Sequence, residues 1–149
     1  MISISRSDSN NPHFVQLVGM LDDHLADRDG EEHSFYAQFN KIDNLEQVIV
    51  AFDDSLPIGC GAIKKHNDNT VEVKRMFTLP DYRGKGVALM ILEELESWAK
   101  ELLFERSLLE TGLRQPDAIK FYTKNKYVEI PNYGQYANVE NSRCFAKTL

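Results

Sequence analysis

The hydrophobic pattern at the start of the chain predicts a strand followed by a helix. Ile2 and Ile4 alternate with serine, which is the period of a strand with one buried face. Asn10-Asn11-Pro12 then offers a side-chain cap and a proline suited to a first helical turn. The apolar positions that follow keep helical spacing to about Asp27: Phe14, Val15, Val18, Leu21 and Leu25.

The middle of the chain is expected to contain a short helix followed by three strands. A short second helix is expected first, around Phe35 and Phe39, because these rings are spaced four apart. Residues 47–52 and 56–64 then predict a β-hairpin joined through Asp53-Asp54-Ser55. Residues 71–78 begin as a clean alternation that breaks at Arg75-Met76-Phe77, which predicts a β-bulge at that point.

The second half of the chain alternates helices and strands. From Ala88 to Leu102 the apolar residues keep helical spacing and the acidic residues take the opposite face, so the longest helix is expected here. Short strands are expected at residues 107–110, 127–130 and 143–147, with a helix at 116–124 that has proline in its first turn. No linker or repeat divides residues 1–149, which predicts one α/β domain.

Charge and cysteine content narrow the function classes. Seventeen basic residues against twenty-three acidic ones give a net charge of −6, which argues against a nucleic-acid binder. The acidic excess serves solubility or attracts a cationic substrate. Cys60 and Cys144 have no metal-ligand spacing and are too few for a disulfide framework. Together with the lack of a signal-peptide or membrane-spanning pattern, this leads us to expect a cytoplasmic protein without membrane contact.

No metal site is expected. The acidic stretch around Asp27-Arg28-Asp29-Gly30 resembles a calcium-binding loop only superficially. When Gly30 is aligned with the glycine of that loop, Leu25 and Tyr36 fall on the first and last ligand positions, where carboxylates are required. None of the four histidines forms a zinc-binding spacing: His13, His24, His33 and His66.

The segment Arg83-Gly84-Lys85-Gly86-Val87-Ala88 predicts an anion site. Its two glycines let the backbone turn so that several N–H groups point at one spot, and the helix that follows adds partial positive charge. A pyrophosphate is the natural ligand. A dinucleotide fingerprint fails because Leu89 stands where glycine or alanine is needed, and a Walker A loop fails because Gly86 follows Lys85.

The same segment resembles the Arg/Gln-x-x-Gly-x-Gly/Ala signature of the GNAT superfamily of N-acetyltransferases. The order of the expected elements over nearly the whole chain is also similar: a strand, two helices, three strands, the long helix, a strand, a helix and two strands. The resemblance implies a mixed, mostly antiparallel central sheet of six to seven strands flanked by about four helices. It also implies acetyl-CoA as co-substrate.

By this resemblance, the backbone of Met76, Phe77 and Thr78 pairs with the pantetheine arm of acetyl-CoA. The N–H groups from Arg83 to Ala88 hold the pyrophosphate, and Gln115 stands where many members have an asparagine that contacts the cofactor. A core role is equally open for Met76 and Phe77. Asn125-Lys126-Tyr127 lacks the family's usual glycine, so Asn125 or Lys126 must end the preceding helix instead.

Two residues are candidates for acid–base catalysis. Tyr122 matches the tyrosine that many family members use to protonate the departing thiolate, and a phenol is protonated at neutral pH. Glu72 lies eleven residues before Arg83, where one branch of the family has its catalytic base. The alternatives are that Tyr122 only packs its helix, and that Glu72 forms an exposed pair with Lys74 or Arg75.

The acceptor pocket is expected to involve Tyr36, Tyr133 and Tyr136. For the last two, a packed surface loop or a homodimer contact is an open alternative. The resulting hypothesis is an N-acetyltransferase that moves an acetyl group directly to a primary amine of a small molecule or peptide in a ternary complex. The alternative is a non-catalytic module that binds an acyl-CoA as a sensor.

Overall fold

The computed structural model describes residues 1–29 and 44–149, which form seven strands and three α-helices. In chain order the elements are β1 (Ile2–Ser7), α1 (Pro12–Asp29), β2 (Gln47–Asp53), β3 (Leu56–Asn67), β4 (Thr70–Thr78), α3 (Val87–Glu101), β5 (Arg106–Gly112), α4 (Pro116–Lys124), β6 (Val128–Ile130) and β7 (Ser142–Thr148). Two short 3-10 turns, η2 (Pro80–Tyr82) and η3 (Gly134–Tyr136), complete them. The α/β class agrees with expectation. Three described helices replace the four expected, and the helix around Phe35 and Phe39 falls outside the described residues.

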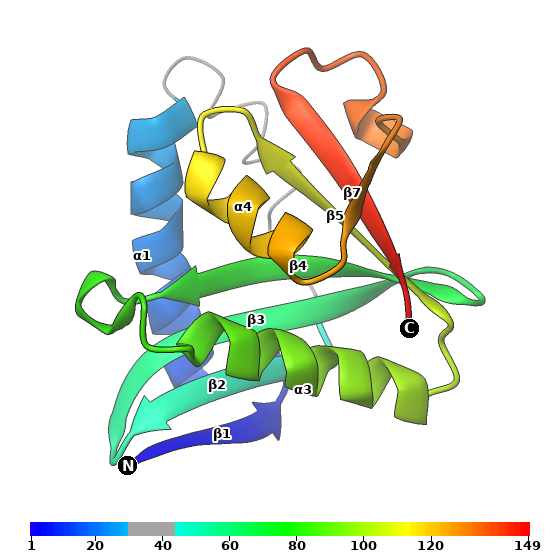
Figure 1. Ribbon diagram of the computed structural model, residues 1–149. Coiled ribbons are helices and arrows are strands. Elements are labelled where there is room, and N and C mark those ends of the chain that lie inside the picture. The colour runs from blue at the N-terminus through cyan, green and yellow to red at the C-terminus, as the bar shows by residue number, and fades with distance from the viewer. Residues whose placement is uncertain (30–43) are drawn as a thin grey trace.

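The seven strands form one mixed sheet in the order β1-β2-β3-β4-β5-β7-β6. Every neighbouring pair is antiparallel except β4 and β5, which run parallel. That parallel ladder is short, since it pairs only residues 70–72 of β4 with 106–108 of β5. Beyond it the two strands diverge, as Figure 1 shows, and the sheet opens between them.

Helices cover both faces of the sheet. Strand alternation sends Val48 and Val50 to a core beneath α1, whereas Ile49 and Ala51 join the core beneath α3 and α4. Phe14, Leu17 and Val18 anchor α1, and Ile91, Leu92 and Leu95 anchor α3, all of them almost fully buried. Each such side chain contributes about 1.5–3 kcal/mol relative to an exposed one, so the two cores hold the sheet in a three-layer stack.

The expected bulge lies in β4. Cys60 of β3 pairs with Phe77 and Ala62 pairs with Lys74, so the one residue Gly61 stands opposite both Arg75 and Met76. Arg75 has a positive φ of 61°, the left-handed conformation typical of some bulges. A Cβ on Gly61 would clash with the Met76 sulfur and with Ile91, so glycine is required where the bulged strand and α3 cross β3. The break in alternation at Arg75 is therefore a true bulge.

The helix ends follow local chemistry. The Asn11 side chain accepts the backbone N–H of His13 at 2.9 Å, which is the expected cap of α1. At the end of α4 it is Lys126, with φ 75°, that adopts the left-handed conformation, whereas Asn125 donates its side-chain N–H to the Phe121 carbonyl. In the described part of the chain, none of the helices has the length and apolar character needed to cross a bilayer.

Candidate functional site: a glycine turn, a groove and a divided sheet

The glycine turn has the backbone that an anion site requires. Gly84 and Gly86 both have positive φ, 77° and 82°, and Gly86 directly precedes the first turn of α3. A Cβ built on either glycine would meet no other atom within 4 Å, so the space beside the turn is open. The first-turn N–H groups of a helix have no partner within the helix. Because Val87 is buried and holds the end of the turn, these donors face a fixed and accessible position.

A groove of about 630 Å³ runs from this turn along the end of β4. Most of the residues expected to hold the cofactor line it: Met76, Phe77, Thr78, Arg83, Gly84, Gly86, Val87, Ala88 and Gln115. Lys85 is expected there too, but its ammonium lies over the ring of Tyr82, 5.2 Å from the ring centre, and its side chain is not part of the lining. Phe77 lines the groove and also packs in the core beneath α1.

The β4 backbone borders this groove with an unpaired edge. Its other edge is bonded to β3, and of the described strands only β5 pairs with the groove side, at residues 70–72. An extended ligand can therefore add to residues 73–78 as a further strand would. Arg83 keeps the end of that edge in place, because its Nε donates to the Thr78 carbonyl at 3.0 Å.

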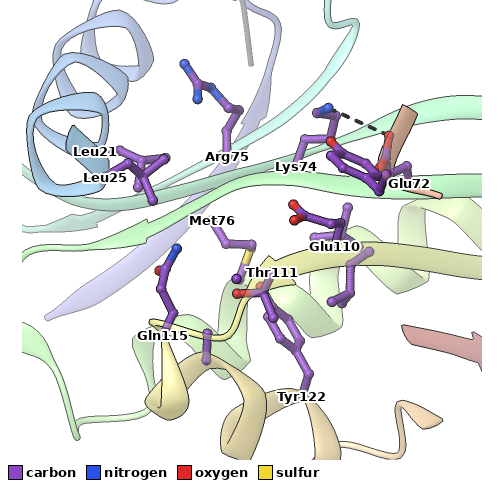
Figure 2. A pocket seen from close by; sticks show the side chains of 15 residues that line it. Leu21, Leu25, Glu72, Lys74, Arg75, Met76, Glu110, Thr111, Gln115 and Tyr122 are labelled. Carbon is purple, nitrogen blue, oxygen red and sulfur yellow. Dashed lines mark ion pairs between the residues drawn. The ribbon is translucent and has the colours of Figure 1, made fainter. Parts of the chain in front are cut away.

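A second, smaller cavity of about 120 Å³ lies where β4 and β5 diverge. Figure 2 shows Met76 extending into it from β4, and Glu110 and Thr111 from β5. The two cavities are adjacent, since five residues line both: Leu21, Met76, Gln115, Ala118 and Tyr122. The glycine-turn groove and the gap in the sheet thus lie next to each other, with Met76, Gln115 and Tyr122 between them.

Tyr122 stands at the junction of the two cavities. Its side chain is 8% exposed, and its ring packs edge-on against Phe121 and Tyr127. Burial raises the pKa of the Tyr122 phenol above its usual value. The phenol is therefore a protonated donor at neutral pH.

Glu72 lies on the far wall of the smaller cavity, and it is buried rather than exposed. Its Oε2 accepts the Tyr133 hydroxyl at 2.7 Å, and its Oε1 faces the Lys74 ammonium at 3.7 Å. The pair of Glu72 with Lys74 that was considered as an alternative does form, but it is not exposed, because the two side chains are only 10–11% exposed. Burial, followed by the charge of Glu72 and the hydrogen bond to it, raises the pKa of Tyr133, so its phenol remains the donor.

Glu110 was not predicted, yet it lines the same cavity as Glu72. It projects from the middle of β5, and its Oε2 accepts the Ser142 hydroxyl at 2.7 Å. Tyr136 lines the cavity beside it and is 2% exposed, and burial together with the charge of Glu110 raises the pKa of Tyr136. One signal in the sequence could have found Glu110: it is the single acid of its strand and directly follows the two buried leucines Leu108 and Leu109.

Other predicted site residues lie apart from the cavities. Tyr133 contacts Glu72 but does not line either cavity, and Tyr36 lies outside the described residues. Asp22 of α1 is half exposed and pairs with the buried Arg75 guanidinium at 3.0 Å. This contact ties α1 to the bulge of β4.

Comparison with known proteins identifies the family. Residues 17–127 match the model of the acetyltransferase (GNAT) family. The chain is 30% identical over 137 residues to an IAA acetyltransferase of Azospirillum brasilense, covering 91% of this chain and 90% of that protein.

Solved structures agree in fold. The crystal structure of a putative acyl-CoA N-acyltransferase from Klebsiella pneumoniae superposes with a TM-score of 0.84 at 24% identity, covering 100% of this chain and 98% of that one. The PaiA N-acetyltransferase of Thermoplasma acidophilum, solved with coenzyme A, gives a TM-score of 0.74 at 19% identity, covering 100% and 99%. Acetyl-CoA is the co-substrate. The chain, with its glycine turn before a long helix and its sheet opened between β4 and β5, belongs to the GNAT family of acetyltransferases.

Proposed function

We propose that this protein transfers the acetyl group of acetyl-CoA directly to a primary amine of a small molecule or peptide within a ternary complex. The observation that carries the proposal is the junction of the two cavities at Met76, Gln115 and Tyr122. A donor in the larger groove and an acceptor in the smaller cavity would meet there. Holding two reactants at one junction is what direct transfer requires.

The residues of the groove suit acetyl-CoA, which supplies the acetyl thioester when bound. The open turn at Gly84 and Gly86 would bind the pyrophosphate through backbone N–H groups. The unpaired edge of β4 would bind the amides of the pantetheine arm. With the phosphates at the turn and the arm along residues 76–78, the thioester would reach the bulge, next to Tyr122.

Proton transfer in this proposal uses one phenol and one carboxylate. As the new C–N bond replaces the thioester C–S bond, Tyr122 would donate its proton to the departing sulfur, and the second proton that the nitrogen loses on becoming an amide would restore the phenol. Glu72 would take the proton that the acceptor ammonium must lose. The Oε1 atom is the better placed to receive it, since Oε2 already accepts the Tyr133 hydroxyl, and Lys74 lies beyond hydrogen-bond length from Oε1.

The acceptor would be an amine that arrives with a positive charge. Glu72 and Glu110 bring two carboxylates to a cavity of about 120 Å³, one from each of the diverging strands. We assign Glu110 to binding the acceptor ammonium and Glu72 to removing its proton. The small volume favours an aliphatic amine or the end of a lysine-like side chain over a bulky ring system.

The first test is binding. The wild-type protein should be stabilised against thermal unfolding by acetyl-CoA and not by ATP or NAD. A protein that no CoA species stabilises would contradict the proposal. A thiol-release assay with a panel of amines and peptides then separates the enzyme from the sensor: binding without acceptor-dependent release favours the non-catalytic module.

The roles of the two carboxylates can be separated kinetically once an acceptor is found. Glu72→Gln should lower kcat by about 100-fold, whereas Glu110→Gln should mainly raise KM for the acceptor. The paired variants keep size and hydrogen bonding and remove only the charge. If kcat falls only in Glu110→Gln, then Glu110 removes the proton and Glu72 binds the acceptor ammonium.

A further inference from the structure

The glycine turn has little packing of its own. A Cβ on Gly84 or Gly86 would meet no atom within 4 Å, so no side chain packs beside these two glycines in that direction. Val87 fixes its end by burial in the core. Its start is held by Arg83, whose Nε donates to the Thr78 carbonyl, and by the residues just before it, in η2.

Tyr82 is the last residue of η2, and its hydroxyl makes a long-range contact. The Tyr82 hydroxyl donates to Asp53 Oδ2 at 2.7 Å, across 29 positions in the sequence. Asp53 ends β2, whose hairpin with β3 is part of the rigid sheet. Tyr82 also lines the large groove beside Arg83 and Gly84. The hydroxyl thus links the groove wall to the sheet.

The charges around this contact are arranged in a row. Lys85, in the middle of the turn, places its ammonium over the Tyr82 ring, and the Asp53 carboxylate lies at the hydroxyl of that ring. The Tyr82 hydrogen bond, with the nearby cations, holds the pKa of Asp53 below its usual range, so the carboxylate is charged at neutral pH. Lys85 and Asp53 thus contact the face and the hydroxyl of the same tyrosine ring.

We propose that Asp53 is a positioning residue for the phosphate groups of acetyl-CoA, acting through Tyr82 on the glycine turn. The proposal rests on the assignment of that turn to the pyrophosphate. Asp53 touches no ligand itself. It holds Tyr82, and through Tyr82 the start of the turn and Lys85, in the arrangement that points the backbone N–H groups into the groove.

The decisive variants are Tyr82→Phe, which removes one hydroxyl, Asp53→Ala, and the double variant. The dissociation constant of acetyl-CoA, measured by calorimetry at fixed ionic strength, should rise about threefold to tenfold in each single variant. The double variant should be no weaker than either single one, because both remove the same contact. Asp53→Asn, which keeps a hydrogen-bond acceptor for Tyr82, should bind within about twofold of wild type.

Two controls separate positioning from a general loss of structure. Asp54→Asn removes a neighbouring charge that, like Asp53, contacts the Met1 amine at 3.3 Å, but Asp54 does not touch Tyr82, so its affinity should stay at the wild-type value. S-acetyl-pantetheine lacks the phosphates, so its affinity should be the same for the wild type and for Tyr82→Phe. A merely structural defect would weaken both ligands.

Three results would overturn the inference: unchanged acetyl-CoA affinity in Tyr82→Phe, losses that add in the double variant, or an equal loss for S-acetyl-pantetheine. A wild-type protein that binds no acetyl-CoA would instead overturn the proposed function. If the wild type binds acetyl-CoA and the variants bind it equally well, only the role of Asp53 is contradicted.

Discussion

The Tyr133 hydroxyl donates to Glu72 Oε2 at 2.7 Å, joining residues 61 positions apart on opposite sides of the open sheet. Tyr133 precedes η3, in the connection between β6 and β7, and Glu72 lies on β4 at the last pair of its ladder with β5. The contact therefore ties the last connection of the chain to the point where the sheet divides. It also fixes which oxygen of Glu72 faces the tyrosine.

Removing this hydroxyl should destabilise the protein. Tyr133→Phe is expected to lower the free energy of unfolding by about 1.5–3 kcal/mol, because a buried carboxylate loses a charge-assisted hydrogen bond. Urea unfolding at pH 7 measures it. A double-mutant cycle with Glu72→Ala should show coupling of about 1 kcal/mol or more. Additive effects would mean that the two side chains do not interact in solution.

Loss of the Tyr122 hydroxyl should affect turnover rather than folding. Tyr122→Phe is expected to lower kcat by about 100-fold with little change in either KM, because only proton donation is removed. Tyr127→Phe is the matched control: Tyr127 packs against Tyr122 but lines neither cavity, so kcat should persist in that variant. Full turnover in Tyr122→Phe would exclude it as the acid.

Alanine at Gly86 and, as a control, at Gly134 should show whether the glycine turn binds the phosphates of acetyl-CoA. Gly86→Ala is expected to cost about 1–3 kcal/mol of stability because of its positive φ. It should also weaken acetyl-CoA binding tenfold or more, since the Cβ enters open space beside the turn. Gly134→Ala carries the same type of strain, with φ 52° and open surroundings, but lies away from the groove. If both variants bind acetyl-CoA alike, the turn is not the phosphate site.

Stability should fall in alkaline solution because of the buried thiols. Burial raises the pKa of Cys60 to about 12 and that of Cys144 to about 11, against about 8.5 in an unfolded chain. Because the folded pKa values are higher, the stabilisation is complete below pH 8.5 and is lost as the pH rises towards the folded values. For Cys60 alone the loss is about 2 kcal/mol by pH 10. Urea unfolding between pH 7.5 and 10 should show it, and Cys60→Ala should flatten the slope. A wild-type stability that stays constant over this range would contradict the prediction.

Local patterns in the sequence predicted most of the elements. Helix 116–124 was expected with the bounds of α4, because a proline at its start and the loss of apolar periodicity at its end are local signals. The bulge was visible as a break in alternation at Arg75, since side-chain direction in a strand depends on neighbouring residues alone. The end of α4 was ambiguous, because Asn125 and Lys126 can each replace the missing glycine.

Contacts between distant segments needed the fold. For Glu72 the choice between a catalytic base and an exposed partner of Lys74 or Arg75 was open, and Glu110 was not considered, because burial of a strand residue depends on what packs over it from elsewhere in the chain. Nothing local indicated that β4 and β5 would part after three paired residues, or that Asp53 would meet Tyr82. Periodicity and turn chemistry thus determined the elements and the glycine turn. Strand pairing and packing decided which side chains share the cavity, since these contacts arise only when segments far apart in sequence are brought together.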